Sequence, residues 1–256
     1  MPITIYLNDK GKFHPSVIPN STGLWQTIYA TDVNGDGNID LLAGNWGWNN
    51  KFWSGKDGPL KMYVADFDGN GKTEQLLSYT SNGIEYPFLA KDEVERQLPL
   101  LKKHYLLYAD YAGTAMKDVF YGWIDSIKPY TAERLGSAVC YGDGKGNFTI
   151  NDLPSIQQRS PIFSFEKIKS HSATETAYLC GGNFFDVIPY EGRYDAQALS
   201  VFQVDNKNNA YSIKQPELSA IKGQVRDVKW LHTINNDSII IAARNNEYLI
   251  IMKLNK

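Results

Sequence analysis

The chain has 256 residues, and its 26 basic and 28 acidic side chains leave a net charge of −2, too little to attract nucleic acid or an anionic membrane. No apolar run approaches the roughly 20 residues that span a bilayer, so we expect no membrane insertion by this segment. Frequent Gly, Asn and Asp residues and 13% aromatic residues suit short strands joined by tight turns. We therefore expect an all-β chain whose binding depends on local sites.

The predicted elements begin with a β-hairpin at Ile3–Phe13, where two β-prone runs flank a polar turn. Further along, four units share one frame of strand, loop and strand: Gln26–Asn45, Leu60–Tyr79, Glu166–Asn183 and Arg226–Asn245. Hairpins are also predicted at Ser137–Ile150 and Leu199–Ile213. A unit followed by a hairpin makes a four-stranded sheet, and serial sheets of this kind stack radially as blades. The repeats therefore predict a β-propeller domain or propeller fragment over residues 1–256, with about four blades.

The loop of the first unit reads DVNGDGNID and places oxygen-bearing side chains at alternate positions. The candidate ligands are Asp32, Asn34, Asp36, the carbonyl of Asn38, and Asp40. This spacing can wrap a hard cation, and three clustered carboxylates would repel one another without one. Because the flanks are β-prone and Ala43 stands where an EF-hand has its last Glu, we expect Ca²⁺ to tie two strands together.

Aromatic residues crowd the stretch that follows this unit, GNWGWNNKFWSGKDG. Trp46, Trp48 and Trp53, together with Phe52, alternate with Gly and Asn, and exposed rings beside amides can stack on sugars. The alternative is that these rings pack between blades. A second, weaker candidate surface is the turn EGRYDA, with Glu191, Arg193, Tyr194 and Asp195.

The loop of the second unit repeats the acidic pattern. Its candidate ligands are Asp66, Asp68, Asn70, the carbonyl of Lys72, and Glu74. We therefore expect two bound calcium ions, one in each loop. The third unit has Ser170, Ser172 and Thr174 at the first three ligand positions, and the turn at Gly142–Asn147 has one acid, Asp143, so neither predicts a metal.

One segment breaks the β pattern, and it predicts a helical insertion near residues 91–120. Asp92 and Glu95 have capping-box spacing, and one helical face is apolar: Val94, Leu98, Leu101, Tyr105 and Tyr108. Pro99 should kink or begin a helix, and Gly113 should separate a second short helix near Ala115–Phe120. The insertion is either a lid over a site or a clamp between blades.

Two cysteines, Cys140 and Cys180, lie in apolar runs without metal or redox spacing, which favours two buried thiols over a disulfide. Four histidines, His14, His104, His171 and His232, lie in different units and form no triad. Whether the terminal strand at 248–254 pairs with the strand at 4–7 is left open by the sequence.

Several phrases resemble the FG-GAP or VCBS repeat family, specifically the C-terminal propeller part of bacterial relatives of cartilage acidic protein, which often carry an ASPIC/UnbV segment. They are DVNGDGNIDLLAGN, QLPLLKKHYLLYADYAGTAMKDVF, SAVCYGDGKGNFTINDLPSIQQRSPIF and GGNFFDVIPYEGRYDA. The resemblance covers nearly the whole chain and implies calcium in both acidic loops. It implies no catalytic residue, and it implies a longer protein with more blades upstream.

Together these observations predict a non-enzymatic, calcium-stabilised module that binds glycan or protein, or acts as a scaffold, at the cell surface or elsewhere outside the cytoplasm. No export signal is recognisable in this segment. The alternatives are a carbohydrate-active lyase or hydrolase on a propeller scaffold, which needs paired carboxylates in one cleft, and a purely structural spacer.

Overall fold

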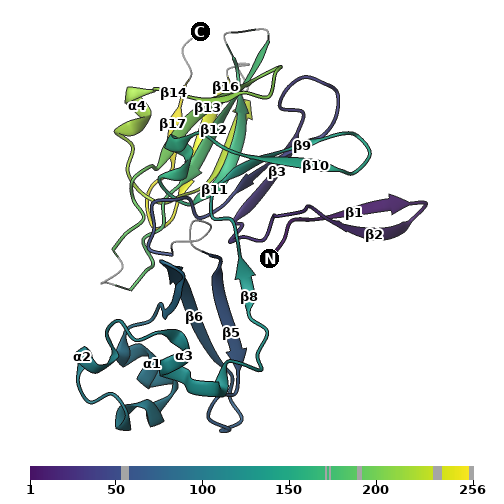
Figure 1. Cartoon of the computed structure of the whole chain (residues 1–256). Coiled ribbons are helices and arrows are strands. Elements are labelled where there is room, and N and C mark those ends of the chain that lie inside the picture. The colour runs from purple at the N-terminus through teal and green to yellow at the C-terminus, as the bar shows by residue number, and fades with distance from the viewer. Residues whose placement is uncertain (53–57, 171, 173, 189–191, 233–237, 254–256) are drawn as a thin grey trace. The chain divides into compact units, whose positions relative to one another are not determined.

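A computed structural model of the chain describes residues 1–52, 58–170, 172, 174–188, 192–232 and 238–253. Strands account for 42% of the structure and helices for 14%, which confirms the prediction of a mostly β chain. The described strands form antiparallel sheets of two to four strands (Figure 1). All four predicted strand–loop–strand units and all three predicted hairpins are present as antiparallel pairs.

The chain divides into two compact units. Unit 1 comprises Met1, Asn20–Gly23 and Lys51–Arg134, and unit 2 comprises Pro2–Pro19, Leu24–Asn50 and Leu135–Lys256. The long segment of unit 1, Lys51–Arg134, therefore interrupts the sequence of unit 2 between two strands that pair with each other. The expected helical insertion at 91–120 is part of this longer inserted unit, which also carries its own four-stranded sheet.

Besides a two-stranded hairpin, unit 2 contains three successive sheets of three or four strands. The first has the order β10-β9-β4-β3, from β3 (Thr27–Thr31), β4 (Asp40–Gly44), β9 (Ala138–Gly142) and β10 (Phe148–Asp152). The second has the order β11-β12-β13-β14, from β11 (Ile162–Ile168), β12 (Glu175–Gly182), β13 (Leu199–Asp205) and β14 (Ala210–Ile213). The third contains β15 (Val225–His232), β16 (Ser238–Arg244) and β17 (Ile250–Met252). Two short helices, η3 (Ser155–Gln158, 3₁₀) and α4 (Pro216–Ser219), lie between strands.

The three sheets pack face to face because successive side chains of a strand point to opposite faces. In the second sheet, Tyr178 and Phe202 lie in the core shared with the first sheet, whereas Leu179 and Val201 lie in the core shared with the third. The rings of Tyr178 and Phe202 stack with their centroids 5.4 Å apart. The second sheet is thus buried on both faces, which explains its nearly continuous apolar runs.

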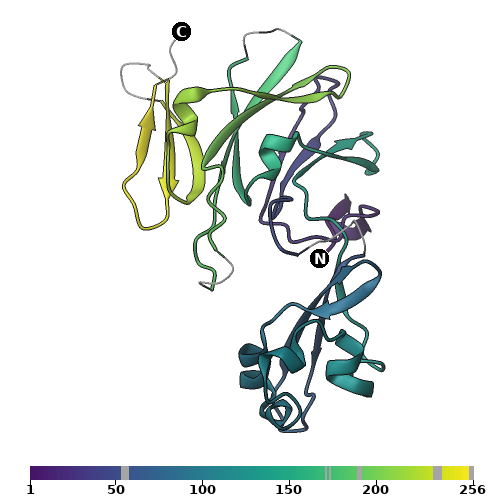
Figure 2. The ribbon, with the colours of Figure 1, turned by 60° about the vertical axis from the view of Figure 1, so that its left-hand side comes forward.

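The base of a hairpin of β1 (Thr4–Asp9) and β2 (Lys12–Val17) packs on the other face of the first sheet, while most of the two strands is exposed. Ile3 and Ile18 pack there against Leu41, Ala43 and Cys140. Figure 2 shows the hairpin (purple) and the third sheet (yellow) at opposite ends of the stacked sheets of unit 2. Strand β17 pairs with β16 and β1 with β2, so in the described residues the two ends of the chain do not pair.

The sheet of unit 1 has the order β7-β6-β5-β8. Its strands are β5 (Leu60–Ala65), β6 (Glu74–Ser81), β7 (Ile84–Pro87) and β8 (Tyr130–Ala132). Its helices are α1 (Lys91–Gln97), η1 (Pro99–Lys103, 3₁₀), α2 (Tyr108–Tyr111), α3 (Met116–Phe120) and η2 (Tyr121–Trp123, 3₁₀). The helices share a core with Tyr63 and Leu76 of the sheet.

The predicted breaks at Pro99 and Gly113 are confirmed, whereas the predicted capping box at Asp92 is wrong. A new helix starts at Pro99, and α3 follows Gly113, as expected. However, the N-cap of α1 is Ala90 without a side-chain cap, because Asp92 lies inside the first turn and accepts a hydrogen bond from the Tyr108 hydroxyl. Tyr108 is therefore exposed, while the other four residues of the predicted apolar face are buried.

Candidate metal centre

The loop between β5 and β6 in unit 1 is shaped by backbone amides that bind the Asp66 carboxylate. Asp66 accepts hydrogen bonds from the amides of Asn70 at 3.0 Å and Gly71 at 2.9 Å. Gly69 and Gly71 adopt φ values of +71° and +83°, which only Gly tolerates readily. The loop therefore folds around its first acidic residue.

Three of the predicted ligands in this loop converge. One carboxylate oxygen from each of Asp66, Asp68 and Glu74 lies within 4.8 Å of the others. Glu74 is buried at the start of β6, and its carboxylate accepts a hydrogen bond from the Phe67 amide at 2.9 Å, which aims it into the loop. Hard cations such as Ca²⁺ take oxygen ligands, so this donor set fits a divalent cation.

The two remaining predicted ligands of this loop lie beside the triad. The side-chain oxygen of Asn70 accepts a hydrogen bond from the Lys72 amide at 2.8 Å. Both residues are exposed. Across the described residues, the triad is the one group of three acidic, His or Cys side chains that meets this distance criterion.

The first acidic loop, between β3 and β4 in unit 2, has the same spacing but a different arrangement. The Asp32 carboxylate accepts hydrogen bonds from the amides of Gly35 at 2.7 Å and Gly37 at 2.9 Å. Asp36 caps the amide of Asn38 at 2.8 Å, which lowers the pKa of the exposed Asp36 carboxyl. The side-chain amide of Asn34 donates to the side-chain oxygen of Asn208 at 2.9 Å and so ties this loop to the β13–β14 turn.

Asp40, the last predicted ligand of the first loop, is fully buried. Its two oxygens accept hydrogen bonds from the amides of Val33 at 3.0 Å and Gly142 at 2.8 Å. Burial raises the pKa of the Asp40 carboxyl against these bonds. Asp40 thus links β4 to β9, and its carboxylate does not converge with those of Asp32 and Asp36 as the triad of unit 1 does. A calcium ion in this loop stays a prediction.

The aromatic residues after the first loop do not form one surface. Trp46 packs with its ring centroid 5.3 Å from those of both Phe184 and Tyr194 in unit 2. Phe52 is buried in unit 1 against Phe88, at 4.9 Å between centroids. Trp48 is exposed, at 54%, and Trp53 lies outside the described residues. Packing therefore accounts for Trp46 and Phe52, and among the described residues of this stretch Trp48 is the ring that is exposed enough to bind a ligand.

The Trp46–Tyr194 contact joins the two candidate surfaces that the sequence indicated separately. Tyr194 is buried, while Arg193 lies over the Phe185 ring at 5.0 Å. Glu191 lies outside the described residues. No local sequence signal predicts this meeting, because it depends on how the first and second sheets stack.

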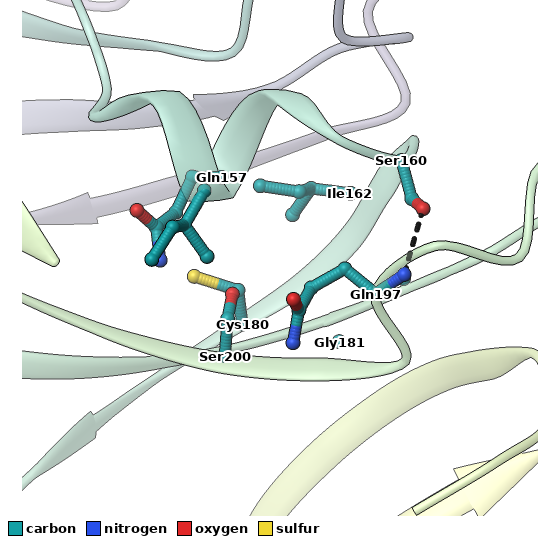
Figure 3. Close-up of a pocket in the computed structure, with 9 residues that line it drawn as sticks. Gln157, Ser160, Ile162, Cys180, Gly181, Gln197 and Ser200 are labelled. Atoms are coloured by element: carbon teal, nitrogen blue, oxygen red, sulfur yellow. Dashed lines mark hydrogen bonds between the residues drawn. The ribbon is translucent and has the colours of Figure 1, made fainter. Parts of the chain in front are cut away.

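A small polar cavity lies beside the second sheet (Figure 3), with room for about one water molecule. Its polar lining includes Gln157, Ser160, Gln197 and Ser200. Cys180 also lines it, and burial raises the pKa of that thiol well above its ordinary value. Cys140 and Cys180 are both buried and form no disulfide, which confirms the predicted thiols.

Sequence reasoning missed a charged cluster on the sheet of unit 1. The Glu85 carboxylate accepts hydrogen bonds from Lys61 at 2.6 Å and Tyr63 at 3.0 Å, and from the buried Ser78 hydroxyl. Burial pushes the pKa of Glu85 upward, but the three donors outweigh it, so this pKa lies below its ordinary value of 4.5. The four residues come from three adjacent strands, so only their register could have revealed the cluster.

We expect Glu85→Gln to lower the free energy of unfolding at neutral pH by about 1–3 kcal/mol, because Lys61 loses its charged partner. A carboxyl with a depressed folded pKa stabilises the fold above its unfolded pKa, and this contribution is lost as the pH falls through the folded value. The variant should therefore lose less stability than the wild type as the pH falls below about 4.5. Urea unfolding as a function of pH measures both effects. Glu217→Gln, at an exposed site, is the control, and an equal loss in both variants would contradict the assignment.

Compared with known proteins, the chain matches no family model and no curated protein. In the described residues, no helix is both long enough and apolar enough to cross a membrane.

Proposed function

We propose that the chain is a calcium-stabilised β-propeller module with a scaffolding or binding role outside the cytoplasm and no catalytic activity of its own. The observation that carries the proposal is the convergence of Asp66, Asp68 and Glu74 in a Gly-rich loop between two strands. Ca²⁺ would supply the positive charge that three neighbouring carboxylates require, and it would brace β5 against β6.

The arrangement of unit 2 supports the propeller part of the proposal. Its sheets follow one another along the chain, each is a meander of antiparallel strands, and the second sheet packs with one face on the first sheet and with the other on the third. The first strands of neighbouring sheets also lie next to one another, β3 beside β11 and β11 beside β15. Successive blades around an axis have this order.

The packing of the aromatic residues favours scaffolding over glycan binding. Trp46 contacts Phe184 and Tyr194, and Phe52 contacts Phe88, so these rings stabilise their own units. A glycan and protein array, probed with calcium and with chelator, separates the two roles. Binding that Trp48→Ala abolishes would establish a ligand face, and silence under both conditions supports a scaffold.

Calcium titration of the purified chain tests the metal site. At a calcium concentration of 100 times the dissociation constant, one site should raise the free energy of unfolding by about 2.7 kcal/mol. The Asn70 and Gly71 amides each bind a different oxygen of Asp66, so Asp66→Asn keeps one of these hydrogen bonds and removes one charge, and most of the calcium gain should disappear. In chelator the variant should differ from the wild type by no more than about 1 kcal/mol, because the loss of one repulsive charge offsets the loss of one hydrogen bond.

Asp143→Asn is the matched control. Asp143 also caps a Gly-rich turn, accepting hydrogen bonds from the amides of Lys145 and Asn147, but it has no neighbouring acidic triad. The control should keep the full calcium response. The stoichiometry from isothermal titration counts the sites: two ions support binding in both loops, and one ion lost with Asp66→Asn supports unit 1 alone. If no ion binds at millimolar calcium, the metal site is wrong.

A further inference from the structure

The chain contains three Asn-Gly pairs, Asn34–Gly35, Asn70–Gly71 and Asn82–Gly83, and asparagine changes chemically most readily in this dipeptide. The Gly amide nitrogen loses its proton and bonds to the side-chain carbonyl carbon of the Asn, which closes a cyclic succinimide as the side-chain nitrogen leaves as ammonia. Water then opens the ring at either carbonyl and gives aspartate or isoaspartate. Gly favours the attack because it has no Cβ to obstruct it. The sequence alone does not rank the three pairs.

In the first acidic loop, hydrogen bonds hold both groups that would react. The Gly35 amide donates to the Asp32 carboxylate at 2.7 Å. Loss of its proton would break this bond and place a second negative charge beside the carboxylate. The side-chain amide of Asn34 donates to Asp36 at 3.1 Å and to Asn208 at 2.9 Å, so its carbonyl carbon cannot turn freely toward the Gly35 nitrogen. The loop therefore protects Asn34.

The second acidic loop protects its own pair in the same way. The Gly71 amide donates to the Asp66 carboxylate at 2.9 Å. The side-chain oxygen of Asn70 accepts a hydrogen bond from the Lys72 amide at 2.8 Å, which fixes that side chain away from the Gly71 nitrogen. The hydrogen bonds that shape each acidic loop thus also slow the reaction of its Asn.

The third pair, Asn82–Gly83, forms the exposed turn between β6 and β7 in unit 1. Both residues have positive φ values, +50° and +76°, and a Cβ at Gly83 would meet nothing within 4 Å. Among the hydrogen bonds of the described residues, none runs from the Gly83 amide to a carboxylate. The nearest acid in sequence, Glu85, is bound by the charged cluster on the sheet. Because β7 is an edge strand that pairs with β6 alone, the turn can open at one end of the sheet.

We propose that Asn82 is the site at which the folded chain deamidates, ahead of the other two pairs, and that isoaspartate there disrupts the β6–β7 hairpin. Isoaspartate adds one carbon to the backbone and one negative charge to a two-residue turn. The strands that this turn joins can then no longer keep Thr80 opposite Glu85. Glu85 is the carboxylate that binds Lys61, so the change reaches the charged cluster of the sheet. The proposal requires no bound ion.

Peptide mass spectrometry of the full chain, kept in mildly alkaline buffer with chelator, tests the order of the three sites, since each conversion adds about 1 Da. Asn82 should convert roughly 10-fold to 100-fold faster than Asn34 and Asn70, the effect of a hydrogen bond to a charged group that must break first. In urea all three should convert at similar rates, because the fold no longer protects any of them. Equal rates in the folded chain, or an Asn82 that converts only in urea, would overturn the proposal.

Two variants test the cause of the order and its effect on the hairpin. Asp32→Ala removes the partner of the Gly35 amide, so conversion at Asn34 should speed up toward that of Asn82, and an unchanged rate would contradict the protection. Asn82→Gly tolerates the positive φ of the turn and has no side-chain amide to lose. Aged wild type should unfold at a lower urea concentration than fresh wild type, whereas aged and fresh Asn82→Gly should unfold alike. An equal loss in both would show that isoaspartate at this turn leaves the hairpin intact. Chelator is present throughout, so no outcome depends on calcium binding.

Discussion

Replacing Phe202 by alanine is expected to lower the free energy of unfolding by about 3–5 kcal/mol. Phe202 is fully buried between the first and second sheets of unit 2, where its ring stacks on Tyr178 and meets Phe165 edge-on at 6.3 Å between centroids. Alanine removes this apolar surface and leaves a cavity between the two sheets. The sheets cannot close the cavity without disturbing their backbone hydrogen bonds.

Urea unfolding measures the loss, and hydrogen exchange localises it. Amides of β12 and β13 should exchange faster, while those of β5 and β6 in unit 1 serve as an internal reference. Tyr248→Ala is the matched control, because that ring is 90% exposed and its removal should change stability by less than about 0.5 kcal/mol. A similar, small loss for both variants would show that the first and second sheets do not share a core.

Gly47→Ala is expected to lower the free energy of unfolding by about 2–5 kcal/mol, from two separate causes. Gly47 has a φ of +86°, a conformation that disfavours a side chain by about 1–2 kcal/mol. A methyl group there would also lie 2.5 Å from the carbonyl oxygen of Gln158, and this backbone atom cannot give way easily. Relieving such overpacking costs about 1–3 kcal/mol more.

Gly11→Ala separates the two causes. Gly11 has a nearly equal φ of +90°, but a methyl group there meets nothing within 4 Å. It should therefore lose only the conformational part, and the difference between the two variants in urea unfolding gives the effect of the contact. An equal loss of unfolding free energy in both variants would mean that the turn at Gly47 can move away from Gln158 with little loss of stability.

The two similar acidic loops differ in how their carboxylates are arranged. Both loops have carboxylates at the first, fifth or third, and ninth positions, and both cap their own amides with the first Asp. The main difference lies at the ninth position, which is Asp40 in the first loop and Glu74 in the second. Both residues accept a hydrogen bond from the second residue of their own loop, Val33 or Phe67, but Asp40 also accepts one from Gly142 of β9, 102 residues away in sequence.

Local chemistry was enough to predict most elements of this chain. Alternating β-prone runs around Gly and Asn turns predicted the hairpins, because strand periodicity and turn conformation depend on neighbouring residues. Pro99 predicted a helix start for the same reason, since its ring limits its own backbone and that of Leu98. The acidic spacing likewise predicted the residues of the triad, Asp66, Asp68 and Glu74.

Tertiary structure alone decided which elements belong together. Sequence order suggested one helical insertion, but β4 pairs with β9 across the whole of unit 1, because register depends on burying both faces of the first sheet. The same long-range packing brings Trp46 to Tyr194 and gathers Lys61, Tyr63 and Ser78 around Glu85. Such contacts join residues whose own neighbours carry no sign of the partner, so spacing along the chain cannot encode them.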